Sequence, residues 1–95
     1  MNHLDERMLA LRQRFLAQTR QMMTGVEAAI AEHDWAELVP TAHSLAGRAA
    51  MFGYPEVGDA ARATEEAIEA GASSDELVRL SRQMLDQLLS ASQDR

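Results

Sequence analysis

His43 is the side chain in this sequence whose type and surroundings are best suited to chemistry. On an α-helix over residues 36–52, successive side chains are rotated by about 100° around the axis. At that spacing an apolar stripe falls on the side opposite His43, formed by Leu38, Ala42, Leu45, Ala49 and Phe52. We expect this stripe to face the core. The imidazole of His43 is then expected to face outward, where another macromolecule can reach it.

The residues expected around His43 on the outward face are small. They are Ala36, Val39, Ala46, Gly47 and Ala50. Gly47 lies one helical turn after His43 and has no side chain, so we expect it to leave clearance for a tetrahedral phosphoryl group. An exposed apolar patch around a reactive side chain is typical of a docking surface.

A single neutral imidazole is a competent nucleophile towards an activated phosphoryl group, provided that a partner supplies the metal ion and the leaving group. The sequence contains no paired-histidine metal motif, phosphate-binding glycine loop or nucleophile elbow. Its histidines, at positions 3, 33 and 43, are scattered. We therefore expect this chain to bind no metal and no cofactor of its own.

The overall composition predicts one globular domain over residues 1–95, since 46% of the residues are hydrophobic and 25% are charged. The absence of cysteine excludes disulfides and thiolate metal sites. The net charge of −6 argues against binding to nucleic acid. The sequence shows neither a membrane-spanning apolar run nor a signal-peptide pattern, so we expect a cytoplasmic protein.

Apolar periodicity predicts helices in the first half of the chain. A stripe over residues 4–32 indicates one long helix, or a short helix followed by a longer one, because Gly25 weakens the pattern. Its members are Leu4, Met8, Leu11, Phe15, Met22, Val26 and Ile30. A second helix is expected over residues 35–52, after an N-cap at Asp34 and with a bend or an irregular first turn at Pro40.

The second half of the chain predicts two more helices. The third begins at Pro55 and stops at Gly71, and Ser73 with Glu76 forms a capping box for the fourth. Four helical segments with short connections predict an all-α fold, an up-down antiparallel four-helix bundle. Because one bundle of this size can bury its own apolar stripes, we expect a monomer.

The run Ala-His-Ser-Leu-Ala-Gly over residues 42–47, with Gly53 ten residues after His43, resembles the signature of histidine phosphotransfer (HPt) domains. That signature reads roughly A-H-x-L-K-G, followed by a glycine at the helix end. Asp34 and Trp35 precede the histidine where the family often starts a helix in this way. The resemblance extends over most of the chain, from about residue 11 to residue 89.

The resemblance implies that His43 accepts a phosphoryl group from the aspartyl phosphate of a receiver domain and passes it to another response regulator. The implied partners are receiver domains and a sensor or hybrid histidine kinase. The chain would be a phosphocarrier without ATPase or autokinase activity, with Mg²⁺ held by the receiver. Gln18, on the preceding helix, is a candidate to orient His43 by a hydrogen bond. The alternative is a non-phosphorylated helical adaptor that binds a receiver or a kinase through the same face.

The sequence departs from the family pattern at Ala46, where the family usually has lysine. Arg48 does not obviously replace that cation, because it lies about 140° from His43 around the helix, although we count it among the expected partner-binding residues. Arg14 and Arg62, on neighbouring helices, are the other candidate cations.

Overall fold

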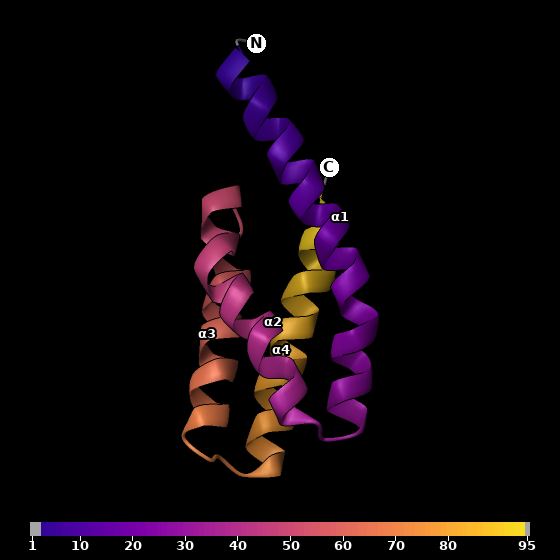
Figure 1. The fold of residues 1–95 in the computed structure, drawn as a ribbon, viewed down its shortest axis with the longest axis vertical. Coiled ribbons are helices and arrows are strands. Elements are labelled where there is room, and N and C mark those ends of the chain that lie inside the picture. Colours follow the sequence, from indigo (N-terminus) through magenta and orange to yellow (C-terminus); the bar gives the residue numbers. More distant parts are fainter. Residues whose placement is uncertain (1–2, 95) are drawn as a thin grey trace.

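The structure, a computed structural model, describes residues 3–94, which form a four-helix bundle. The helices are α1 (His3–Ala31), α2 (Trp35–Arg48), α3 (Pro55–Glu69) and α4 (Ser74–Ser92), and a short 3₁₀ helix, η1 (Ala49–Phe52), follows α2. Successive helices run in opposite directions, and α4 returns to pack beside α1 (Figure 1). The predicted all-α, up-down four-helix bundle is confirmed.

α1 is one continuous helix of 29 residues, about 43 Å long at the usual rise per residue. Gly25 lies within it, so neither a break nor a separate first helix is present in the described part of α1. Residues 3–14 are all exposed, and this segment projects from the end of the bundle, although Nε of Arg12 still donates to the carbonyl oxygen of Phe52 at 3.1 Å (Figure 1). We call this segment the overhang. It makes the molecule 48 Å long, against 22 and 17 Å in the other two directions.

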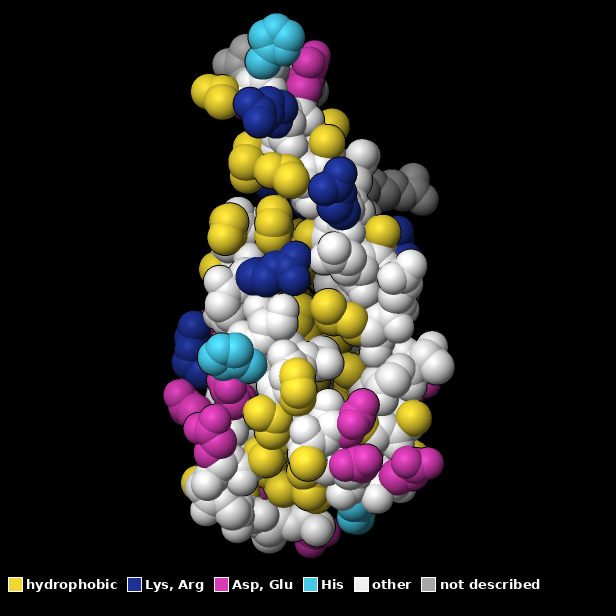
Figure 2. All heavy atoms as spheres, viewed as in Figure 1, with side chains coloured by type: hydrophobic (Ala, Val, Ile, Leu, Met, Phe, Trp, Pro, Cys, Tyr) yellow, Lys and Arg dark blue, Asp and Glu magenta, His cyan; other side chains and the backbone are white. Residues whose placement is uncertain are grey.

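The apolar side chains of the overhang are not covered by the bundle. Leu4 is 70% exposed and Leu11 is 43% exposed, whereas Phe15 is only 1% exposed. The helix predicted over residues 4–32 is confirmed, but the first members of its apolar stripe are exposed, because the other helices end before they cover them. Figure 2 shows these uncovered hydrophobic side chains along the projecting helix. The monomer stays a prediction, and its premise that the bundle buries every stripe is not met here.

The buried stripe of α2 is confirmed. Four of its predicted members are buried and the fifth is half-buried: Leu38, Ala42, Leu45, Ala49 and Phe52. The ring of Phe52 stacks on Phe15 with 4.9 Å between the ring centroids. α2 also packs closely on α3 at Gly58, where an added Cβ would lie 3.7 Å from the carbonyl oxygens of Leu45 and Ala46. Because the two helices approach closely, side chains on their exposed surfaces can contact one another.

The helix starts follow the capping signals in the sequence. The backbone N–H of Glu37 donates to Oδ1 of Asp34 at 3.3 Å, and that of Glu76 donates to Oγ of Ser73 at 3.3 Å. Each bond satisfies a donor that the first helical turn leaves unpaired. No helix among residues 3–94 combines the length and the apolar character needed to cross a bilayer.

α2 continues through Pro40, so the irregular first turn is wrong, while the alternative of a bend at Pro40 stays a prediction. Proline removes the donor that would pair with the carbonyl of Ala36, and this residue is exposed, so water can hydrate that carbonyl. The irregularity lies at the other end of α2, where the helix tightens into η1 before Gly53. Gly53 has a φ of 96°, a left-handed conformation that favours glycine.

The candidate functional site around His43

His43 lies on the outer surface of α2, with 78% of its side chain exposed. Its predicted outward orientation is confirmed, because the buried stripe occupies the opposite side of the helix. Figure 2 shows a histidine ring on the face formed by α2 and α3, with basic and acidic side chains next to it. The imidazole can therefore be reached without any movement of the bundle.

The ring of His43 is held by Glu65, a residue of α3. Nδ1 of His43 lies 2.7 Å from Oε2 of Glu65, whose side chain is only 15% exposed. An ionised carboxylate can only accept hydrogen bonds, so Nδ1 carries the hydrogen. In the neutral ring the lone pair then lies on Nε2, the other nitrogen. Sequence periodicity assigns Glu65 no role, because its contact with His43 depends on the register between α2 and α3.

Gln18 does not orient His43 as predicted. Its Oε1 accepts a hydrogen bond of 2.9 Å from Nη2 of Arg48, and the hydrogen bond of the His43 ring goes to Glu65 instead. The physical reason is the direction in which α1 meets α2. α1 packs against the side of α2 that carries Arg48, far around the helix from His43.

Arg48, on α2, contacts residues of both α1 and α2. Besides Gln18, its guanidinium donates to Oγ of Ser44 at 3.3 Å and lies over the ring of Phe15, 5.9 Å from the centroid. The side chain is half-buried. These three neighbours show that the guanidinium links two helices of its own chain, and its place in the partner-binding face stays a prediction.

Four of the five small residues predicted around His43 lie on α2, and the fifth, Ala50, lies in η1. Ala36, Gly47 and Ala50 are exposed, and Val39 and Ala46 are half-buried. A Cβ placed on Gly47 would have no heavy atom of residues 3–94 within 4 Å, its own helical turn aside. The packing of this chain therefore does not require a glycine there. The space beside His43 is open to a group from outside.

Arg62, on α3, lies beside Ala46. Its Nη2 donates to the carbonyl oxygen of Ala46 at 3.2 Å, and its Nη1 lies 3.6 Å from Oδ1 of Asp59. The Arg62 side chain is 54% exposed. Because α2 and α3 are antiparallel, this contact lies one turn along from the pair formed by His43 and Glu65. Arg14, the other candidate cation, lies on the overhang.

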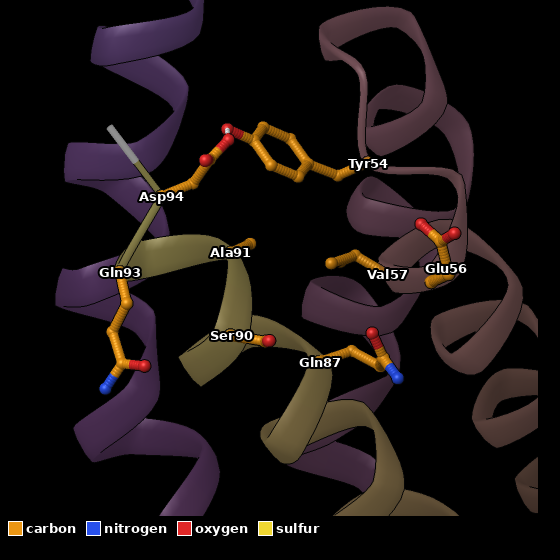
Figure 3. Close-up of a pocket in the computed structure, with 8 residues that line it drawn as sticks. All are labelled: Tyr54, Glu56, Val57, Gln87, Ser90, Ala91, Gln93 and Asp94. Carbon is orange, nitrogen blue, oxygen red and sulfur yellow. Dashed lines mark hydrogen bonds between the residues drawn. The ribbon is translucent and has the colours of Figure 1, made fainter.

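A separate pocket lies where the start of α3 faces the end of α4 (Figure 3). It is lined by Tyr54, Glu56, Val57, Gln87, Ser90, Ala91, Gln93 and Asp94. The Tyr54 hydroxyl donates to Oδ2 of Asp94 at 2.6 Å, and Figure 3 shows the two side chains pointing toward each other. Burial, followed by this hydrogen bond and the charge of Asp94, raises the pKa of Tyr54 to about 12. None of the residues around His43 lines this pocket.

The arrangement around His43 is suited to nucleophilic chemistry that depends on a partner. Among residues 3–94 no group of three or more histidine, cysteine or acidic side chains is placed to hold a metal ion.

The Hpt domain family model matches residues 10–91, from within the overhang to near the end of α4. No curated protein and no solved structure matches the chain.

Proposed function

The chain belongs to the Hpt domain family, and from this premise we propose that His43 accepts a phosphoryl group from the aspartyl phosphate of a receiver domain and passes it to a second response regulator. Membership identifies it as a phosphotransfer domain of two-component phosphorelays, which interacts with receiver domains and kinases. The observation that supports the finer proposal is the exposed ring of His43, with Nδ1 bonded to Glu65.

In the proposed step, the lone pair on Nε2 of His43 attacks the phosphorus atom. The bond between phosphorus and the aspartate oxygen breaks, and its electron pair leaves with the aspartate carboxylate. The ring keeps the hydrogen on Nδ1 and gains a positive charge, which the carboxylate of Glu65 stabilises at 2.7 Å. Transfer to the second response regulator is the same step in reverse.

In the proposed reaction the receiver supplies the metal ion. Phosphoryl transfer needs charge stabilisation on the equatorial oxygens, usually by a metal ion. We propose that Mg²⁺ is held by the receiver domain and that this chain acts as a phosphocarrier without ATPase or autokinase activity. The receiver would dock on the strip formed by Ala36, Val39, Ala46 and Ala50, whose small side chains permit a close approach to His43.

The direct test mixes the purified chain with a receiver domain carrying a radiolabelled aspartyl phosphate, in the presence of Mg²⁺. We expect the label to move to the wild type and not to a His43→Gln variant. The transferred label should be labile in acid and stable in base, as a phosphohistidine is. Failure of transfer from several receivers that still bind the chain would overturn the proposal and indicate an adaptor.

The docking strip is tested separately. Val39→Asp and Ala50→Glu place a carboxylate in the proposed interface, so we expect both to slow transfer while the far-UV circular dichroism of the bundle is unchanged. Ala28→Glu is the matched control, because Ala28 is an exposed alanine on α1. Equal transfer rates in all three variants would remove the strip from the interface.

A further inference from the structure

We infer that Arg62 binds the phosphoryl oxygens of His43 once that residue is phosphorylated. The inference rests on the proposed function, since it concerns the product of the same step. It adds to the site a cation from α3 that acts on the phosphorylated state of the chain.

The need for a cation follows from the charges around the ring. A phosphoryl group adds between one and two negative charges near neutral pH. The other ring nitrogen of His43 already lies 2.7 Å from the carboxylate of Glu65. Phosphorylation therefore gathers anionic oxygens on both sides of one ring, and a nearby positive charge lowers the free energy of that state.

Arg62 is held close enough to His43 for its guanidinium to reach a phosphoryl group on that residue. On α2, His43 and Ala46 are three residues apart, and on α3 their partners Glu65 and Arg62 are also three residues apart. Three residues of α-helix rise about 4.5 Å, so the guanidinium of Arg62 is anchored close to one helical turn from the level of His43. The side chain of Ala46 is a single methyl group, so it does not fill the space between them.

The present partners of Arg62 are easily exchanged. One is a carbonyl oxygen at 3.2 Å and the other is the exposed carboxylate of Asp59 at 3.6 Å. Surface ion pairs of this kind contribute little free energy. A phosphoryl group offers a guanidinium two oxygens in a bidentate geometry, which is a stronger interaction.

Other arginines near this face are less suited. Arg48 donates to Gln18 and Ser44 and lies over Phe15, so recruiting it would break the contact between α1 and α2. Arg14 lies on the overhang, outside the packed bundle.

The experiment uses phosphoramidate, a small phosphoryl donor that needs no protein partner. The chain is phosphorylated on His43, and the pKa of the phosphoryl group is measured by ³¹P NMR in a pH titration. This pKa is compared between the wild type and variants. A bound cation favours the fully ionised phosphoryl group and so lowers its pKa. We expect Arg62→Gln to weaken the ionisation about threefold, a rise of about half a pKa unit. Arg62→Lys should restore most of the wild-type value, because it keeps the charge.

Arg79→Gln is the control, since it removes an exposed arginine of α4 that pairs with Glu76. It should titrate like the wild type. A second readout is the side-chain N–H resonance of Arg62 in the NMR spectrum of the wild type. The resonance is assigned by its loss in Arg62→Gln. It should shift when the wild type is phosphorylated. A structural role alone would move neither quantity.

The outcomes separate the two proposals. If phosphoramidate labels His43 but Arg62→Gln titrates like the wild type and the Arg62 resonance does not move, this inference is overturned and the proposed function stands. If the wild type is not phosphorylated on His43 by phosphoramidate or by any receiver, the proposed function itself fails.

Discussion

Nδ1 of His43, on α2, lies 2.7 Å from Oε2 of Glu65, on α3. The two residues are 22 positions apart in the sequence, and the close packing of α2 on α3 at Gly58 brings their helices together. The contact with an ionised carboxylate places the hydrogen on Nδ1 and a negative charge beside that nitrogen. In the proposed transfer, Nε2 is the nitrogen that attacks, and the Glu65 carboxylate lies on the other side of the ring.

Replacement of Glu65 by glutamine should slow phosphoryl transfer to His43. The amide oxygen can still accept from Nδ1, but the charge that stabilises the ring after attack is lost, so we expect a fall of about tenfold, equivalent to about 1.4 kcal/mol. Transfer is measured from a labelled receiver domain. Glu66→Gln is the matched control, because Glu66 is the exposed neighbour. If the two variants transfer equally fast, Glu65 has no special role.

Gly47→Ala should raise the free energy of unfolding and, in the same variant, lower the rate of phosphoryl transfer to His43. Alanine favours the helix by about 1 kcal/mol relative to glycine, and nothing in the described chain clashes with the new Cβ. The methyl group would occupy the clearance beside His43. Gly25→Ala, on α1, meets equally open space and should raise the free energy of unfolding without a change in transfer. Parallel urea unfolding and transfer assays decide whether the two effects separate.

Arg48→Ala should destabilise the bundle while leaving the chemistry at His43 nearly intact. It removes hydrogen bonds to Gln18 and Ser44 in the half-buried contact between α1 and α2. We expect the free energy of unfolding to fall by about 1–2 kcal/mol. Chemical denaturation measures this loss, and the same preparation is assayed with phosphoramidate. A variant of unchanged stability that accepts no phosphoryl group would place Arg48 in the site after all.

The overhang should contribute little to the free energy of unfolding of the bundle. Phe15→Ala removes a ring that is 1% exposed and stacked on Phe52, so it should cost about 3–5 kcal/mol. Leu4→Ala and Leu11→Ala change exposed side chains and should each cost less than about 0.5 kcal/mol. Urea unfolding at low protein concentration makes the comparison. A large, concentration-dependent loss in either leucine variant would show that a second chain covers the overhang.

Stability should decline at alkaline pH because of Tyr54. The pKa of this hydroxyl is raised to about 12 in the folded chain, from an ordinary value near 10. The folded state therefore holds the proton more tightly than the unfolded chain does. The corresponding stability is fully present below pH 10 and is lost as the pH rises toward 12. Thermal unfolding across this range should show a steeper fall for the wild type than for Tyr54→Phe, and parallel curves would contradict the assignment.

The sequence alone determined which face of α2 is buried and where α2 and α4 begin. The apolar stripe of α2, the caps at Asp34 and Ser73 and the outward position of His43 follow from local periodicity and capping chemistry. The structure confirms each of these. Such features depend on residues within a few turns of one another, which is why one sequence is enough to find them.

The tertiary structure decided which side chains from different helices meet. The sequence predicted Gln18 beside His43, whereas the packing of α1 on α2 places Gln18 where it accepts a hydrogen bond from Arg48. It is the register of α3 on α2 that brings Glu65 to His43 and Arg62 to Ala46. Helical periodicity fixes the face on which a residue lies, but it does not fix the relative rotation and axial shift of two packed helices. Those depend on side-chain packing across the whole core.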